Sequence, residues 1–209
     1  FSDLHGPALV RYRIYGNGSG GSNGTLSVDS IKIFGTALSV VRVQARIFLQ
    51  GPYVDSLGLM SDALRVEGLI PLFEPYGGLG FSLTNGEFLD PLVLSTSGPN
   101  AIVDWVLLEL RSSEDSSTVV GRRSGLVQRD GDVVDIDGIS PISFGIPEGD
   151  YYVSVIHRNH LGVMPSSSSE LSDAPTSIDF TSPLTETFGA NAQKESMGVR
   201  RLWSGEVDR

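Results

Sequence analysis

The sequence predicts an all-β protein: an antiparallel β-sandwich, immunoglobulin-like or jelly-roll-like, that carries one long irregular loop segment. Three observations support this prediction. In residues 41–49 every second residue is apolar, as in a strand with one buried face. The 209 residues include 25 Gly and 11 Pro, which suit many turns between short strands. No segment shows a sustained helical period of 3.6 residues.

The elements follow in order along the chain. Residues 1–38 are expected to form a β-hairpin, with strands at 10–15 and 26–34 around a glycine-rich tip. The main sandwich is expected over 39–165. Its strands are predicted at 40–50, 102–111, 118–120, 125–128, 133–136 and 150–157.

Three further segments are predicted to be irregular or short. Prolines and glycines interrupt residues 57–94, so this long loop is expected to be packed against the sandwich or to be functional. A serine run opens a linker or surface loop at 166–184. The tail, 185–209, is expected to contain a short helix near 190–197 and to pack through Trp203.

Composition excludes several classes of partner and site. Asp and Glu number 25 against 15 Lys and Arg, a net charge of −10 that repels phosphate backbones and anionic lipid. We therefore expect no nucleic-acid partner. No apolar run reaches the ~20 residues of a membrane span, so no membrane insertion is expected either. The absence of Cys rules out disulfides and thiol chemistry.

Several ionisable or polar residues interrupt the apolar strand sequences. Burying such a group without a partner costs about 1–3 kcal/mol, so we expect them to pair in a structural polar network, with Asp104 and Glu109 bound to Arg46 or Arg158. The network comprises Arg46, Asp104, Glu109, His157, Arg158, Asn159 and His160.

Two chemical alternatives use the same residues. His157 and His160 could bind a metal ion together with His5 or with a carboxylate from Asp104 or Glu109. A hydrolase could use either histidine with Asp104. Nucleophile-elbow, phosphate-loop and dinucleotide motifs are all missing, so we expect no enzyme and assign no catalytic residue.

Two other groups are candidate binding sites. One contains four carboxylates within eight residues, which either fit a calcium site, the one cofactor considered, or serve as turn residues: Asp130, Asp132, Asp135 and Asp137. The other is a set of aromatic residues in or near the irregular segment that either bind sugar rings or fix that segment to the sandwich: Tyr53, Phe73, Tyr76 and Phe81.

Four motifs, in order, carry a family resemblance over about residues 43–207. Residues 45–72, 102–111, 128–138 and 157–164 resemble a module of large bacterial surface proteins of the type IX secretion class. Residues 188–194 and 202–208 resemble the segment that precedes a dockerin-like repeat in such proteins. Residues 8–35 resemble the last two strands of an upstream jelly-roll module.

The resemblance implies an extracellular, cell-surface location and a role in adhesion or scaffolding. We therefore expect a non-enzymatic structural or adhesive module. Strands 10–15 or 26–34 would pair with another molecule, which would make the chain a self-assembling filament subunit or a partner of other surface proteins. The alternative is a glycan partner, with the chain as a carbohydrate-binding module of a secreted polysaccharide-degrading protein.

Overall fold

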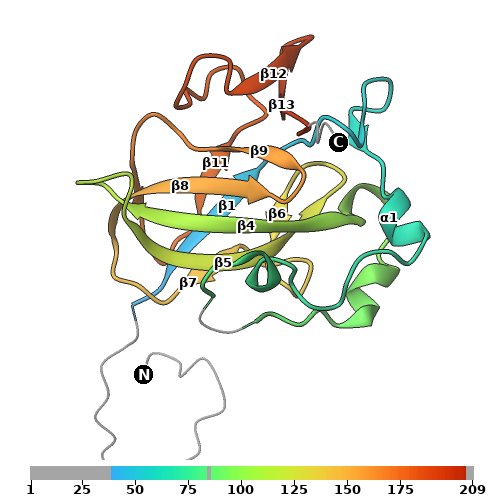
Figure 1. Cartoon of the computed structure of the whole chain (residues 1–209), viewed down its shortest axis with the longest axis horizontal. Helices are drawn as coiled ribbons and strands as arrows, with labels where there is room; N and C mark the ends of the chain where they lie inside the picture. The colour runs from blue at the N-terminus through green and yellow to red at the C-terminus, as the bar shows by residue number, and fades with distance from the viewer. Residues whose placement is uncertain (1–38, 84–85, 206–209) are drawn as a thin grey trace, which may run out of the picture. The chain divides into compact units, whose positions relative to one another are not determined.

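The computed structural model describes residues 39–83 and 86–205 (Figure 1). The predicted N-terminal hairpin, 1–38, lies outside the described residues. The helices are short: α1 (Ala63–Val66), η1 (Gly77–Leu79), η2 (Pro91–Ser95) and η3 (Gly98–Asn100). The strands are β1 (Val41–Arg46), β2 (Tyr53–Val54), β3 (Leu59–Met60), β4 (Ile102–Ser112), β5 (Val119–Gln128), β6 (Val133–Val134), β7 (Ile142–Phe144), β8 (Gly149–His157), β9 (His160–Val163), β10 (Ser169–Leu171), β11 (Thr176–Asp179), β12 (Gln193–Ser196) and β13 (Val199–Leu202).

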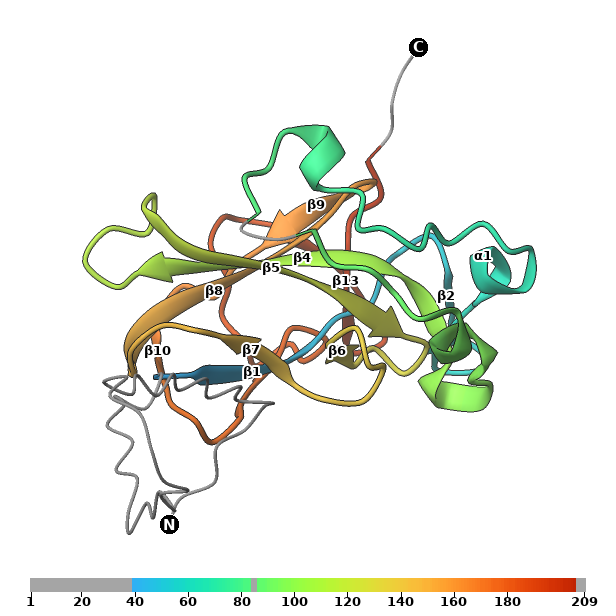
Figure 2. The ribbon, with the colours of Figure 1, turned by 90° about the horizontal axis from the view of Figure 1, so that it is seen from below.

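Two sheets face each other and confirm the predicted all-β sandwich. A three-stranded sheet has the order β11-β1-β7, and a six-stranded sheet has the order β10-β8-β4-β5-β6 with β9 paired to β8. Figure 2 shows β1 and β7 on one side of the larger sheet. One pair departs from the antiparallel prediction, because β11 runs parallel to β1.

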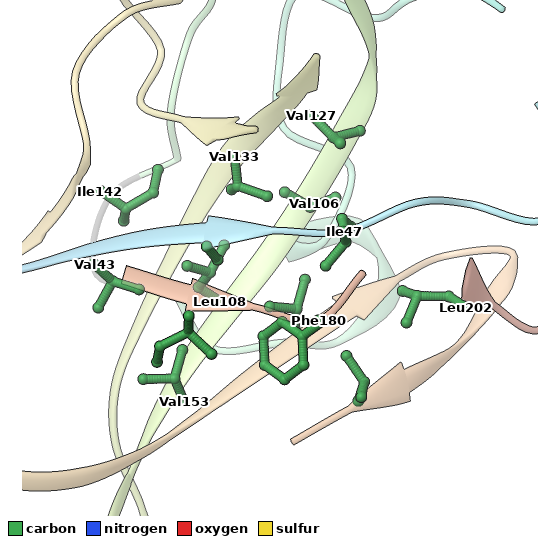
Figure 3. Close-up of a cluster of buried hydrophobic side chains, with 14 of the residues drawn as sticks. Val43, Ile47, Val106, Leu108, Val127, Val133, Ile142, Val153, Phe180 and Leu202 are labelled. Carbon is green, nitrogen blue, oxygen red and sulfur yellow. The ribbon is translucent and has the colours of Figure 1, made fainter. Parts of the chain in front are cut away.

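The core between the sheets follows from the alternation in β1. Val41, Val43 and Ala45 are fully buried, and they pack with residues of the opposite sheet such as Val106 and Leu108 (Figure 3). A buried valine or leucine side chain contributes about 1.5–3 kcal/mol. This cluster is therefore the main source of stability for the sandwich.

A second apolar cluster covers the outer face of the six-stranded sheet. The irregular segment supplies Tyr76 and Leu89, both fully buried, which pack with Trp105 and Leu107 of β4. The part of this segment around η1 lies on the side of the sheet opposite β1, whereas α1 lies at the end of the sheet (Figure 2). Every β4 residue from Ile102 to Leu110 is buried, as predicted for a central strand.

Residues 166–184, predicted as a linker or surface loop, instead supply one strand to each sheet. β10 pairs with β8 and β11 pairs with β1. Leu171 and Phe180 are fully buried in the core between the sheets. These strands could not be predicted from the serine-rich sequence, because each has only three or four residues and one buried side chain.

The tail also differs from the prediction. The helix expected near 190–197 is replaced by the hairpin β12–β13, whose two-residue turn places Met197 at φ 53° and Gly198 at φ 73°. Leu202 is fully buried in the core, whereas Trp203 remains partly exposed. Leu202, rather than Trp203, therefore anchors the tail.

A turn at Asp130–Gly131 joins β5 to β6, and its glycine gives a testable prediction. Gly131 has φ 96°, and a Cβ there would lie 2.7 Å from the carbonyl oxygen of Ile47. We expect Gly131→Ala to lower the free energy of unfolding by about 2–3 kcal/mol, through backbone strain and this close contact. Urea titration would measure the change, with Gly78→Ala as the control because its added Cβ meets no atom within 4 Å. Equal midpoints for the two variants would contradict the prediction.

Candidate functional site

The candidate site is centred on Asp104, a buried carboxylate in β4. A register shift between Ile102 and Asp104 interrupts the pairing of β4 with β5 at this position. One carboxylate oxygen accepts from the backbone N–H of Trp105 at 2.8 Å. The other lies 2.8 Å from the guanidinium of Arg158 and 3.3 Å from Nε2 of His157. The predicted pairing of Asp104 with Arg158 is therefore present.

The hairpin between β8 and β9 places two histidines side by side. His157 and His160 are cross-strand partners, and their ring centroids are 4.7 Å apart in an edge-on arrangement. Nδ1 of His160 lies 2.9 Å from Nδ1 of His157, which also accepts from the backbone N–H of Asn159 at 3.2 Å. The spacing of two residues between the histidines is thus explained by a tight turn.

These contacts assign the protons on both rings. An ionised carboxylate only accepts hydrogen bonds, so Nε2 of His157 donates to Asp104. Nδ1 of His157 is then the acceptor for His160, whose Nδ1 carries the proton. It follows that Nε2 of His160 has a free lone pair.

A pocket of about 380 Å³ adjoins the two histidines. Asp104, His157 and His160 line it, and Nε2 of His160 is buried with no hydrogen-bond partner among the described residues. The other lining residues are mostly apolar: Leu49, Gly51, Pro52, Ser61, Ala63, Leu64, Val103 and Asn159. The sequence predicted the polar residues but gave no sign of the pocket, because its walls come from distant segments.

Burial, together with the neighbouring His157, lowers the pKa of His160 to about 4, although Asp104 opposes the shift. The ring is therefore neutral near pH 7. In the unfolded chain the pKa returns to about 6.5. Between these two values only the unfolded state takes up the proton, so stability falls as the pH is lowered.

This linkage predicts a specific effect of His160→Phe. The wild type should lose about 1–2 kcal/mol between pH 6.5 and pH 4 through this group, a figure reduced because the ring is partly exposed and solvent screens it. His160→Phe should lack that contribution. Urea titrations at both pH values would measure the difference, and parallel pH profiles for the two proteins would contradict it.

The remaining predicted network separates into two other clusters. Glu109 pairs with Arg111 at 2.6 Å and Arg122 at 2.7 Å, rather than with Arg46 or Arg158. Arg46 donates to the carbonyl oxygen of Asp130 and lies 3.8 Å from the carboxylate of Asp132. Glu109 and Arg46 are thus both paired, but neither has the partner that was predicted, and no single network is formed.

The four carboxylates considered for calcium do not converge. Asp135 binds Arg123 at 2.9 Å, and Asp137 accepts from Ser140 within its own turn. Asp130 accepts from the backbone N–H of Asp132 at 3.2 Å. Across residues 39–83 and 86–205 no group of three or more carboxylates or histidines is arranged to hold a metal ion.

The four aromatic residues do not form a common sugar-binding surface. Tyr76 is fully buried, and its hydroxyl donates to the carbonyl oxygen of Trp105 at 3.0 Å. Tyr53 packs on the first cluster, beneath the guanidinium of Arg201, whereas Phe81 packs on the second cluster. Phe73 is 66% exposed and contacts Phe88 edge-on.

A second, polar pocket of about 670 Å³ lies beside the β12–β13 hairpin. Trp203 forms part of it, and the ammonium of Lys194 lies 6.0 Å from the centre of the indole ring. The other lining residues are Ser166, Glu186, Thr187, Gly189, Asn191, Ala192, Gln193, Glu195 and Arg200. Trp203 was predicted only to pack the tail, because sequence alone gave no indication of its polar neighbours.

Comparison with known proteins gives no relative: neither a protein family, nor a curated protein, nor a solved structure matches the chain. The resemblance to the type IX secretion class therefore stays a prediction. In the part of the chain that the structure describes, no helix is long and apolar enough to span a bilayer.

Proposed function

We propose that this chain is a non-enzymatic, extracellular structural module that works in attachment or assembly at a bacterial cell surface. The observation that supports the proposal most is the pairing of the ionisable side chains in the central strands with one another. Asp104 and Glu109 each contact two cationic or imidazole groups within the fold. Side chains paired in this way hold the strands of the sheet together.

The arrangement around His160 argues against a hydrolase. Ser61 lines the same pocket, yet among the described residues its hydroxyl forms no hydrogen bond with either histidine. A serine nucleophile requires a base within about 2.6–3.2 Å. A histidine with a pKa of about 4 is also a weak base at neutral pH.

Self-association is the testable part of this proposal. The strands expected at 10–15 and 26–34 lie outside the described residues, so the support for it is their sequence alone. Light scattering of the full chain over a concentration series should show oligomers. Val28→Pro should abolish them, because proline removes a backbone donor from a strand. Ser22→Pro, in the glycine-rich tip, is the matched control and should leave them intact. A monomer at every concentration would refute self-association.

The location is tested separately. Antibodies against the chain should label intact cells of the source organism, and protease added to those cells should remove the labelled protein. Labelling only after lysis would refute the extracellular role.

A carbohydrate-binding module is the second candidate, and the polar pocket at Trp203 favours it. The partly exposed indole ring of Trp203 could stack on a sugar ring, while nearby amides and charged groups could bind the sugar hydroxyls. We expect Trp203→Ala to reduce retention on polysaccharide gels at least tenfold. Phe188→Ala is the control, since Phe188 is also a partly exposed aromatic residue of the tail but does not line the pocket. Absence of retention for the wild type on a broad glycan panel would remove this candidate.

A further inference from the structure

A single proton lies between the two histidines in the turn that joins β8 to β9. Nδ1 of His157 accepts from Nδ1 of His160 at 2.9 Å and from the backbone N–H of Asn159 at 3.2 Å. Nε2 of His157 donates to the carboxylate of Asp104. Nε2 of His160 is buried, without a partner among the described residues. Every ring nitrogen of the pair is therefore either hydrogen-bonded or enclosed by the fold.

This arrangement has no place for an additional proton. A proton on Nδ1 of His157 would face two N–H groups at hydrogen-bonding distance. A proton on Nε2 of His160 would create a cation whose new N–H is shielded from water and has no acceptor. The lowered pKa of His160 agrees with this exclusion. If the turn opened, both rings would reach water and could take up protons.

Few other charges face the two rings. Asp104 on β4 favours a protonated ring, but its carboxylate is already bound to Arg158. Within the described residues, the pocket beside the rings contains no titratable side chain other than Asp104, His157 and His160. The C-terminal segment 202–205 carries no charged residue. The proton uptake of this turn therefore depends on the two histidines.

The C-terminal segment 202–205 is hydrogen-bonded to the same turn. The backbone N–H of Leu161 donates to the carbonyl oxygen of Trp203 at 2.9 Å. In the other direction, the backbone N–H of Gly205 donates to the carbonyl oxygen of Asn159, also at 2.9 Å. Opening the turn would break both bonds and free the end of the segment.

We propose that this turn is an acid-sensitive switch, which holds segment 202–205 at neutral pH and releases it when the histidines take up protons. Only the open turn binds the additional protons, so a lower pH favours the open state. Release would also displace Trp203, which forms part of the polar pocket. The switch does not depend on the function proposed above.

Hydrogen exchange of the full chain, followed by NMR, measures the opening directly. After correction for intrinsic exchange rates, the protection of the Leu161 and Gly205 amides should fall at least about tenfold between pH 7 and pH 5. This follows from the uptake of one proton by a histidine whose pKa in the open turn is about 6.5. The control is the amide of Phe180, which donates to the carbonyl oxygen of Arg46 in the core and should keep its protection.

Two variants test whether the histidines cause the release. His160→Phe removes one proton-binding ring and keeps an aromatic side chain. The fall in protection between pH 7 and pH 5 should therefore be about tenfold smaller in this variant than in the wild type. Glu170→Gln is the control, because it removes an exposed carboxylate of β10 and should respond to pH like the wild type.

Three results would overturn the proposal. They are unchanged protection of the Leu161 and Gly205 amides at pH 5, a parallel loss at Phe180, which would mean that the whole sandwich unfolds, and an equal loss in His160→Phe. Should His160→Phe fail to fold, the comparison of these amides with Phe180 in the wild type still decides whether acid opens this turn selectively.

Discussion

Trp105→Ala is expected to lower the free energy of unfolding by about 3–5 kcal/mol. The side chain is fully buried in the second apolar cluster, and its indole N–H donates to the carbonyl oxygen of Pro71 at 2.7 Å. The substitution would remove a large ring and leave that carbonyl without its partner. Because Trp105 of β4 packs against the irregular segment and donates a hydrogen bond to it, the segment should detach from the sheet more easily in the variant.

Two measurements separate this effect from a general loss of packing. Urea titration gives the free energy of unfolding, and limited proteolysis reports on the irregular segment, residues 57–94, directly. Trp105→Ala should be cleaved in that segment under native conditions, whereas the wild type should resist. Val120→Ala is the control, since Val120 is 41% exposed at the surface and should change stability by less than about 0.5 kcal/mol. A loss below about 1 kcal/mol for Trp105→Ala would mean that the segment is held elsewhere.

The parts of the fold that the sequence predicted are those with long, regular patterns. The alternation at residues 41–49 gave the buried face of β1, and the apolar run from Ile102 gave the central strand β4. At residues 118–128 the apolar pattern alone gives the wrong strand boundaries. Glycine and arginine interrupt their pattern and suggest two short strands, yet β5 is continuous from Val119 to Gln128 because β4 pairs with it along most of its length.

Elements that depend on tertiary contacts were not predicted. β10 and β11 have little apolar sequence, and they exist as strands because β8 and β1 offer them hydrogen-bonding edges. The β12–β13 turn was missed for a local reason. Met197 occupies a left-handed conformation that Asn or Gly usually adopts, so the sequence lacked the usual signal of a two-residue hairpin turn.

The candidate site was predicted in its chemistry but not in its geometry. Polar residues in apolar strands implied partners, and Asp104 with Arg158 is one such pair. The identity of the other partners depends on strand register, which the sequence does not specify. Glu109 lies directly opposite Arg122 on β5. This strand register brings the two side chains together, and it makes Arg122, not Arg46, a partner of Glu109.

The buried carboxylate of Glu109 carries the second large prediction. Its side chain is only 2% exposed, and each of its oxygens binds a different arginine. Arg111 lies two residues along β4, on the same face, and Arg122 lies directly across on β5. Glu109 therefore neutralises two cations that would otherwise repel each other at the end of the sheet.

Removing the carboxylate while leaving both arginines should be costly. We expect Glu109→Gln to lower the free energy of unfolding by about 3 kcal/mol. This is the lower end of the range for breaking a buried ion pair. The lower end applies because the two arginine side chains are 26% and 28% exposed, so water can partly solvate them. Urea titration would measure the loss. The matched control is Glu195→Gln. The Glu195 carboxylate is 48% exposed and binds a single arginine, so this variant should change stability by less than about 1 kcal/mol.

A double variant, Glu109→Gln with Arg122→Gln, tests the mechanism, since removing one of the two cations should restore part of the lost stability. If the double variant is as unstable as the sum of the two single variants, repulsion between the arginines is not the cause, and Glu109 acts only through its own hydrogen bonds.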